Sequence, residues 1–170
     1  MATIYLGDDS YRFQYTSIEE LRKEAKKHGI TIGDNVSIED NVTNVTIEDN
    51  VTIGDNVSIG DWVFIYNDIT IGNNVTIGNA ITIWSRTTIG NDVFISDDVF
   101  ITNDCTIGNG CAIVYRKQIK NSCTIEDNVI ILKNSTIKEN WTKKGIVYLV
   151  NEYNFHRTQE EWEIYFLNNV

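Results

Sequence analysis

Aromatic side chains gathered around one arginine are the residues of this chain whose types and spacing could bind a ligand. Trp84-Ser85-Arg86 stands where other repeats have a corner such as Gly54-Asp55-Asn56, and Arg86 is the only Lys or Arg between Lys27 and Arg116. A guanidinium beside indole and phenol rings can hold an anion or stack on a neighbouring subunit. A salt bridge in a subunit interface is the alternative. The ligand or interface candidates are Trp62, Phe64, Tyr66, Trp84, Arg86 and Phe100.

Basic residues gather in the C-terminal part of the chain: Arg116, Lys117, Lys120, Lys133, Lys138, Lys143 and Lys144. Such a run could contact phosphate groups, and a solvated charged surface is the alternative. Lys117 falls at a position that the repeat described below directs inward. Because an unpaired buried ammonium is costly, either the strand bulges there or Lys117 reaches an acidic or solvated partner.

Groups for metal binding or covalent chemistry are few. The chain contains two histidines, His28 and His156, which cannot form a three-histidine zinc site. We find no phosphate loop or nucleophile elbow and expect no metal and no permanently bound cofactor. Rows of Asp and Asn could coordinate calcium, but these residues more often only form turns. The three cysteines are expected to be free thiols, although Cys105 and Cys123 are spaced to lie one coil apart.

Length and charge restrict the class of protein. A chain of 170 residues is long enough for one domain with a sizeable core. Its formal net charge of −10 argues against a surface for nucleic acid or anionic membranes. No apolar run approaches the length of a membrane span, and the N-terminus lacks a signal-peptide layout. We therefore expect a soluble, cytoplasmic protein.

A six-residue repeat must position the candidate residues. Isoleucine occurs at Ile32 and Ile38, then at Ile47, and every six residues from there to Ile137. A small or branched residue lies two places earlier, so both side chains point to the same face of a short strand. The next positions are rich in Gly, Asp and Asn, which form corners. The three extra residues before Ile47, near Asn44-Val45-Thr46, predict a local bulge or a missing corner.

The repeats must stack to be stable. Two buried aliphatic side chains contribute roughly 3–6 kcal/mol, whereas ordering six residues costs about 6–12 kcal/mol. Neighbouring turns recover the difference through main-chain hydrogen bonds and a continuous core, which is the physics of a solenoid.

The hexad Ile53-Gly54-Asp55-Asn56-Val57-Ser58 resembles the hexapeptide repeat of the left-handed parallel β-helix acyltransferases, and the resemblance spans about residues 30–137. It implies an all-β solenoid of about six triangular, left-handed coils. It also implies a homotrimer, binding sites between subunits, and acetyl-CoA as a co-substrate lying toward the C-terminal end. The candidate contacts for the CoA phosphates are Arg116, Lys117, Lys120 and Lys138. Phe94 joins the candidate residues because relatives often carry Trp there.

The resemblance implies a general base as well, commonly a histidine on a coil or its loop. Neither histidine of this chain lies in the repeat, so His156 in the tail is the candidate base and the base is otherwise unidentified. The leading hypothesis is an acyl-CoA-dependent acyltransferase acting on a sugar or another small hydroxyl or amino acceptor. The alternative is a non-catalytic trimeric β-helix for assembly or ligand binding.

Both ends of the solenoid need caps, because open coils expose unpaired strand edges. We predict an N-terminal cap over residues 1–29, the solenoid over 30–140 and a C-terminal strand and helix over 141–170. The N-terminal cap is expected to contain a hairpin around Gly7-Asp8-Asp9-Ser10 and a helix. That helix has Ser17 and Glu20 as its capping box and ends at Gly29.

With three hexads in a coil, residues eighteen apart stack. This spacing predicts that Trp84 lies over Tyr66 and that Phe64 and Phe100 flank Thr82. Large outward aromatics on neighbouring rungs favour self-association or a binding surface. An outward row of Thr52, Thr70, Thr88, Thr106 and Thr124 also allows an ice-binding hypothesis, although Thr simply suits exposed strand positions.

Overall fold

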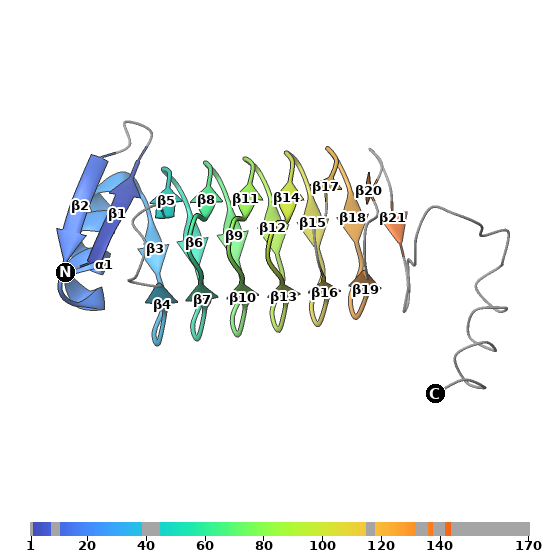
Figure 1. Ribbon diagram of the computed structural model, residues 1–170, viewed down its shortest axis with the longest axis horizontal. Helices are drawn as coiled ribbons and strands as arrows, with labels where there is room; N and C mark the ends of the chain where they lie inside the picture. The colour runs from blue at the N-terminus through green and yellow to red at the C-terminus, as the bar shows by residue number, and fades with distance from the viewer. Residues whose placement is uncertain are drawn as a thin grey trace, which may run out of the picture.

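The computed structural model describes residues 2–7, 11–38, 45–114 and 118–131, together with the backbone of residues 136–137 and 142–143. Within these residues the chain forms three sheets that run along one axis (Figure 1), with eight strands in sheet A, seven in sheet B and six in sheet C. All neighbouring strands are parallel except those of the N-terminal hairpin. No helix in this described part of the chain is long and apolar enough to cross a membrane.

The strands are short and regular. Sheet A contains, in spatial order, β2 (Tyr11–Tyr15), β1 (Ala2–Leu6), β5 (Val45–Ile47), β8 (Phe64–Ile65), β11 (Thr82–Ile83), β14 (Phe100–Ile101), β17 (Gln118–Ile119) and β20 (Thr136–Ile137). Sheet B contains β3 (Thr31–Ile32), β6 (Thr52–Ile53), β9 (Thr70–Ile71), β12 (Thr88–Ile89), β15 (Thr106–Ile107), β18 (Thr124–Ile125) and β21 (Thr142–Lys143). Sheet C contains β4 (Ser37–Ile38), β7 (Ser58–Ile59), β10 (Thr76–Ile77), β13 (Phe94–Ile95), β16 (Ala112–Ile113) and β19 (Ile130–Ile131).

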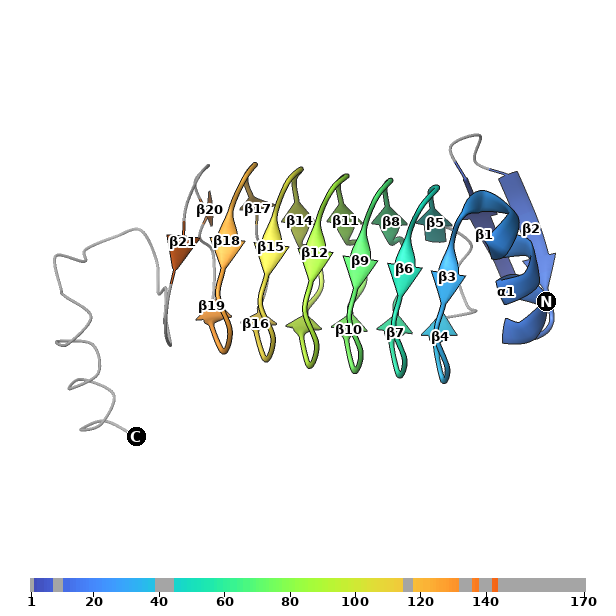
Figure 2. The ribbon, with the colours of Figure 1, turned by 180° about the vertical axis from the view of Figure 1, so that it is seen from behind.

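From β3 onward, consecutive strands of the chain belong to sheets B, C and A in turn, so three strands make one triangular coil. The coils run from β3–β5 to β18–β20 and lie side by side along the axis (Figure 2). The predicted parallel β-helix of triangular coils with in-register stacking is confirmed. Three edges result, and we name them by the sheets they join: the A–B edge, the B–C edge and the C–A edge.

The third residue of each described corner has a left-handed backbone, which explains the Asn and Asp of the repeat. Asn56 has φ 57° and Asp104 has φ 61°. Short polar side chains tolerate this conformation better than other L-residues. The first corner residue is often Gly for another reason: a Cβ on Gly72 would lie 2.7 Å from the carbonyl oxygen of Gly90 in the next coil.

The prism is filled by the two inward residues of each strand. Val51 and Ile53 are 0 % and 1 % exposed, and the same pattern continues through Val129 and Ile131. Cys105, Cys111 and Cys123 occupy the position of the smaller residue and are buried free thiols, as predicted. Burial raises the pKa of the Cys105 and Cys111 thiols, which keeps them protonated and unreactive.

The N-terminal cap contains the predicted hairpin and helix. Strands β1 and β2 pair antiparallel, and β1 continues sheet A by pairing with β5. Helix α1 (Ile18–Ala25) is followed by the 3-10 turn η1 (Lys26–His28) and ends at Gly29, which has φ 69°. The Ser17 Oγ accepts a hydrogen bond from the Glu20 N–H, while the Glu20 carboxylate accepts two from Thr16.

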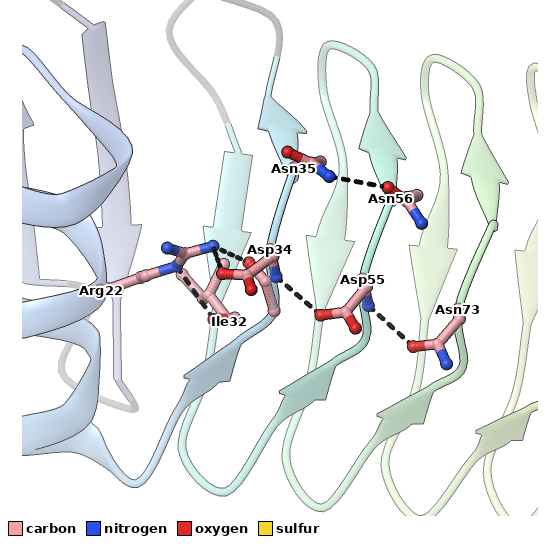
Figure 3. Close-up of polar contacts among 8 residues, drawn as sticks. Arg22, Ile32, Asp34, Asn35, Asp55, Asn56 and Asn73 are labelled. Atoms are coloured by element: carbon pink, nitrogen blue, oxygen red, sulfur yellow. Dashed lines mark hydrogen bonds and ion pairs between the residues drawn. The ribbon is translucent and has the colours of Figure 1, made fainter.

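Arg22 fastens helix α1 to the first coil. Its guanidinium donates to the carbonyl oxygens of Ile32 (3.1 Å) and Gly33, and it pairs with Asp34 at 3.0 Å (Figure 3). Ile32 belongs to β3, the outermost described strand of sheet B, and Gly33 follows it, so no further described strand lies beyond them to donate to these oxygens. Arg22 therefore caps an open sheet edge.

Some predictions fall outside the described residues. Val45 and Thr46 lie in register in β5, so the three extra residues before Ile47 fall within 39–44, beyond what the structure describes. Lys117 also lies outside, as do Arg116, Lys138, His156 and the predicted C-terminal helix. The division into 1–29, 30–140 and 141–170 stays a prediction.

Candidate functional site

The A–B edge is where the described repeat departs most from its own pattern. Its corners are residues 48–50, 66–68, 84–86, 102–104 and 120–122. Their first positions hold Glu48, Tyr66, Trp84, Thr102 and Lys120, with no glycine among them. Because the backbone ladder is unchanged, with Tyr66 N–H donating to the Ile83 oxygen at 2.9 Å, the edge carries different side chains on the same frame.

Tyr66 and Trp84 form the centre of this edge. Their ring centroids are 4.4 Å apart and the planes differ by 6°, so the indole lies flat on the phenol ring as the eighteen-residue spacing predicted. Phe100 lies at an angle to the indole, with centroids 6.2 Å apart and planes at 59°. We call Tyr66, Trp84 and Phe100 the aromatic site. One indole face is covered by Tyr66, and no described aromatic ring stacks on the other.

The outward row of sheet A borders the aromatic site. Thr82 pairs in register with Phe64 on one side and Phe100 on the other, as predicted. Phe64 is 37 % exposed. A small side chain therefore separates two large rings that are two strands apart, about 10 Å by strand spacing.

Two candidate residues lie apart from this group. Trp62 is at the opposite border of sheet A, on the C–A edge, with a left-handed backbone and 50 % exposure. Phe94 is on sheet C, between Thr76 and Ala112, and is 46 % exposed. The structure thus brings together Phe64, Tyr66, Trp84 and Phe100 but not Trp62 or Phe94.

Arg86 pairs within its own chain. Its Nε donates to Asp104 Oδ1 at 2.6 Å and its Nη2 to Asp104 Oδ2 at 3.0 Å. Asp104 raises the pKa of Arg86, chiefly by this hydrogen bonding, and Arg86 lowers the pKa of Asp104 in the same way. The sequence predicts an anion site or an interface salt bridge for Arg86; in the structure its guanidinium pairs with a carboxylate one coil further on, and the two predictions stay untested.

Several polar groups are buried at or next to the corners of the A–B edge. Thr87 is 0 % exposed and is the single buried polar residue of the described core; its hydroxyl donates to the Thr102 oxygen at 3.3 Å. The Thr102 hydroxyl donates to the Ile119 oxygen at 2.8 Å. Among the described residues, the buried Trp84 Nε1 and Asn67 Oδ1 have no hydrogen-bond partner. Two of the described buried side-chain atoms without a hydrogen-bond partner therefore lie at the corners of the A–B edge, and Asp61 Oδ1 is a further one on the C–A edge.

A histidine–aspartate pair on the same edge is missing from the sequence analysis. His28 lies one rung before Asp49, with Nδ1 to Oδ1 at 3.5 Å, and its ring stacks on Tyr11 at 6.0 Å. The Asn50 N–H donates to the His28 oxygen, which fixes this register. The eighteen-residue count does not predict that His28 and Asp49 are neighbours. The extra residues in the first coil lengthen the distance in sequence between stacked residues there from eighteen to twenty-one.

The electrostatic surroundings of the aromatic site are acidic. Residues 45–114 contain nine acidic residues and one basic residue, Arg86. Asp68 precedes Arg86 in the same column, and Asp104 follows it. Asp68 accepts a hydrogen bond from the neutral Asn50 amide at 3.2 Å. The column of Asp68, Arg86 and Asp104 therefore holds an excess of one negative charge.

Of the four candidate CoA contacts, Lys120 lies in the described part of the chain. It is exposed and occupies the first corner position of the A–B edge, two rungs beyond Trp84. By strand spacing this is about 10 Å. Within the described residues no group of three or more His, Cys, Asp or Glu side chains could hold a metal ion.

Comparison with known proteins gives one family match. The family model of the bacterial transferase hexapeptide (six repeats) matches residues 50–80, which confirms the predicted resemblance to the hexapeptide-repeat transferases over that segment. No curated protein sequence matches the chain.

Solved structures of low sequence identity are similar in part. The acetyltransferase domain of PglB from Neisseria gonorrhoeae has 13% identity and a TM-score of 0.46, over 76% of this chain and 61% of that one. A mutant of perosamine N-acetyltransferase from Caulobacter crescentus, in complex with CoA and GDP-perosamine, has 15% identity and a TM-score of 0.38, over 76% and 60%. A mutant of AntD, an N-acyltransferase from Bacillus cereus in complex with dTDP and coenzyme A, has 17% identity and a TM-score of 0.40, over 91% and 98%. The chain thus spans about 60% of the length of the first two.

Proposed function

We propose that this protein is an acyl-CoA-dependent acyltransferase that transfers an acetyl group to a sugar or another small hydroxyl or amino acceptor. One observation carries the proposal: residues 50–80 match the bacterial transferase hexapeptide repeat, and this segment contains Tyr66 of the aromatic site and the neighbouring Phe64. A repeat built only for stability has no need of outward rings at Tyr66 and Trp84. Departures from a uniform repeat are therefore the natural place for a binding function.

The reaction consists of three chemical events. The acceptor oxygen or nitrogen attacks the thioester carbonyl carbon, the carbon–sulfur bond breaks to release CoA as its thiol, and the acceptor loses a proton. Holding the two reactants in contact supplies a large part of the rate enhancement. A group with an accessible lone pair must accept the proton, or the acceptor must be nucleophilic enough without it.

The A–B edge suits the placement of both reactants. We assign the acceptor to the aromatic site and the phosphates of acetyl-CoA to the basic side chains toward the C-terminal end, Arg116, Lys117, Lys120 and Lys138. Lys120 stands about 10 Å from Trp84 along the same edge, a distance that an extended cofactor molecule spans easily. The co-substrate is consumed in each turnover, so no permanently bound cofactor is required.

The general base must be a residue close to the acceptor, and His28 is the histidine that the structure describes. The His28 ring lies beside Asp49 on the same edge, with Nδ1 3.5 Å from Oδ1, but it lies three rungs from Trp84, about 14 Å by strand spacing. A base must come within hydrogen-bond reach of the acceptor, so His28 cannot serve a small acceptor at Trp84 of its own chain. His156, or a residue of a neighbouring subunit in the homotrimer that we propose, remains the candidate.

A non-catalytic trimeric β-helix for assembly or ligand binding is the second candidate function. It is favoured by residues 45–114, which contain no histidine.

The outward Thr row of sheet B is longer than the five residues Thr52 to Thr124, because Thr31 and Thr142 pair in register with it. The ice-binding hypothesis for this row is tested by thermal hysteresis of the protein in supercooled water.

Calorimetric titration of acetyl-CoA, with molar mass by light scattering on the same sample, tests the proposed function. Saturable micromolar binding to a trimer is the expected result, followed by thiol release from acetyl-CoA when an acceptor is added. Absence of heat at two temperatures would leave the non-catalytic solenoid. A Trp84→Leu variant that keeps the trimer but loses acceptor-dependent thiol release assigns the aromatic site to binding; loss of the trimer assigns it to the interface.

A further inference from the structure

We propose that strand β2 of the N-terminal cap pairs antiparallel, edge to edge, with β2 of a second copy of this chain, so that two solenoids join end to end. The pairing does not depend on the acyltransferase reaction, because it takes place at the N-terminal end of the prism and not at the A–B edge. Three features of the molecule support it: the position of β2 in sheet A, the aromatic side chains that β2 carries, and the distribution of charge along the chain.

Strand β2 (Tyr11–Tyr15) is the last strand at the N-terminal end of sheet A. It pairs with β1 on one side, no described strand lies beyond it on the other, and both views show it outermost along the axis of the prism (Figure 1, Figure 2). With five residues it is longer than the coil strands, most of which have two. Sheet B ends differently, since Arg22 donates to the carbonyl oxygens of Ile32 and Gly33 at its first strand. A terminal strand such as β2 offers backbone N–H and C=O groups to a strand of another chain.

The aromatic side chains of β2 lie on the inward face of sheet A but are not fully covered. The register of the hairpin places Phe13 beside Ile4 and Tyr11 beside Leu6. Ile4 and Leu6 are fully buried, whereas Phe13 is partly buried and Tyr11 is 47 % exposed. The centroid of the Tyr11 ring lies 6.4 Å from that of Phe13 and 6.0 Å from that of His28. A further strand with apolar side chains on this face would cover the rings and continue the core.

Charge selects one register for two copies of β2. Directly opposite residues of antiparallel strands share a face and interact. Pairing centred on Arg12 would place the two Arg12 side chains opposite each other, which is unfavourable. Pairing centred on Phe13 uses all five residues of each strand and places Arg12 opposite Gln14 of the second copy. In this register Tyr11 lies opposite Tyr15 of the second copy on the inward face, where the rings of the two copies meet.

The distribution of charge favours contact through the caps. Residues 1–29 contain five basic and five acidic residues, whereas residues 45–114 contain one basic and nine acidic residues. Contact through the caps joins the parts of two chains whose charges balance and keeps the acidic coils of the two copies apart. Each chain still carries a net charge of −10. The pairing should therefore tighten when added salt screens the remaining repulsion.

Molar mass as a function of concentration tests the pairing. The full-length protein is measured by sedimentation equilibrium from about 10 µM to about 1 mM, because a paired strand is far smaller than a standard interface of about 20–30 residues a side and should give a weak complex. We expect the mass to double, from one chain to two or, if the trimer proposed above forms, from three to six. The doubled particle should be about twice as long in small-angle X-ray scattering, since the solenoids join end to end. A mass that stays constant over this range overturns the proposal.

Substitutions of Gln14 test the register without changing the inward face. Gln14→Glu places a carboxylate opposite Arg12 of the second copy and should tighten the pairing about threefold, whereas Gln14→Arg places two guanidinium groups opposite each other and should weaken it about threefold. The matched control is Gln118, an exposed glutamine in β17 of the same sheet. Gln118→Glu and Gln118→Arg make the same changes in net charge away from β2 and should have small effects of the opposite sign. Equal effects at the two positions would mean that only net charge matters, and the pairing of β2 would be rejected.

Cysteine cross-linking locates the contact. In the register centred on Phe13, position 12 of one copy lies opposite position 14 of the other, with Cα atoms about 4.5–5.5 Å apart, which a disulfide can span. A mixture of Arg12→Cys and Gln14→Cys proteins, incubated with oxidised glutathione, should therefore form a disulfide-linked pair, while each variant alone should form little. The native cysteines should not interfere, because all three are buried. Equal linkage in Arg12→Cys alone would contradict this register, and no linked pair in the mixture would overturn the proposal.

Discussion

The B–C and A–B edges have the same backbone geometry but carry different side chains and different side-chain interactions. At the B–C edge, corners such as Gly72-Asn73-Asn74 stack in a ladder in which each second-position amide donates to the side chain of the next coil, as Asp55 N–H does to Asn73 Oδ1 at 2.8 Å (Figure 3). At the A–B edge the first position is aromatic or polar, and the rings and the ion pair replace this ladder. The regular edge therefore stabilises the solenoid through its side-chain ladder, whereas the irregular edge presents large and charged side chains that this ladder does not require.

The largest expected contrast concerns the first corner position. In Gly72→Ala, the new Cβ would lie 2.7 Å from the Gly90 oxygen, so we expect a loss of about 2–3 kcal/mol in unfolding free energy, measured by chemical denaturation. The matched control is Thr102→Ala at the first position of the A–B edge, which already holds a Cβ and should lose only the contribution of one hydroxyl hydrogen bond, about 1 kcal/mol. Equal losses would show that the two edges have the same steric requirement.

The second contrast concerns the ladder. Asn91 Oδ1 accepts from Asn73 N–H at 2.8 Å, and Asn91 Nδ2 donates to Asn109 Oδ1 at 3.2 Å. Asn91→Ala removes both hydrogen bonds and should cost about 1–2 kcal/mol in unfolding free energy. Ser85→Ala, at the equivalent position of the A–B edge, should cost less than about 0.5 kcal/mol. If Ser85→Ala proved as costly as Asn91→Ala, the A–B edge would carry a ladder after all.

The phase of the repeat explains what could be predicted from the sequence. Because the period holds, the inward residues, the Tyr66–Trp84 stack and the Phe64–Thr82–Phe100 row follow from counting eighteen residues. The same count places Asp104 over Arg86, yet the choice of this partner over an external anion depends on side-chain conformation, which the period does not specify. The position of His28 beside Asp49 could not be predicted by the same count, because it depends on where helix α1 and the turn after it end and on the extra residues of the first coil.

Phe94 shows the limit of resemblance as evidence. It was grouped with the other aromatic residues because relatives often carry Trp there, whereas the phase puts it on sheet C with Thr76 and Ala112. Position within the period is a physical constraint on which residues share a face. A pattern shared with a family carries no such constraint for one particular side chain.

The third contrast asks whether the aromatic rings stabilise the edge that they occupy. A double-mutant cycle with Tyr66→Leu and Trp84→Leu should give a coupling energy of about 0.5–1 kcal/mol, because the rings stack at 4.4 Å. A cycle of Phe94→Leu with Trp84→Leu is the control, since Phe94 is on another sheet, and should give a value near zero. A coupling near zero for both pairs would mean that the stack is retained for binding and adds nothing to stability.

The smallest contrast is the exposed ion pair of the A–B edge, and its sign is set by pH. Arg86 lowers the pKa of Asp104 in the folded protein, chiefly through their hydrogen bonds. The pair therefore stabilises the fold above the pKa of an unfolded aspartate, about 4, and this contribution is lost as the pH falls through the lower folded value. Thermal melts of the wild type and Arg86→Gln should differ slightly at pH 7 and converge near pH 3. Melting curves of the wild type and Arg86→Gln that stayed equally far apart at pH 7 and pH 3 would mean that the difference does not come from this ion pair.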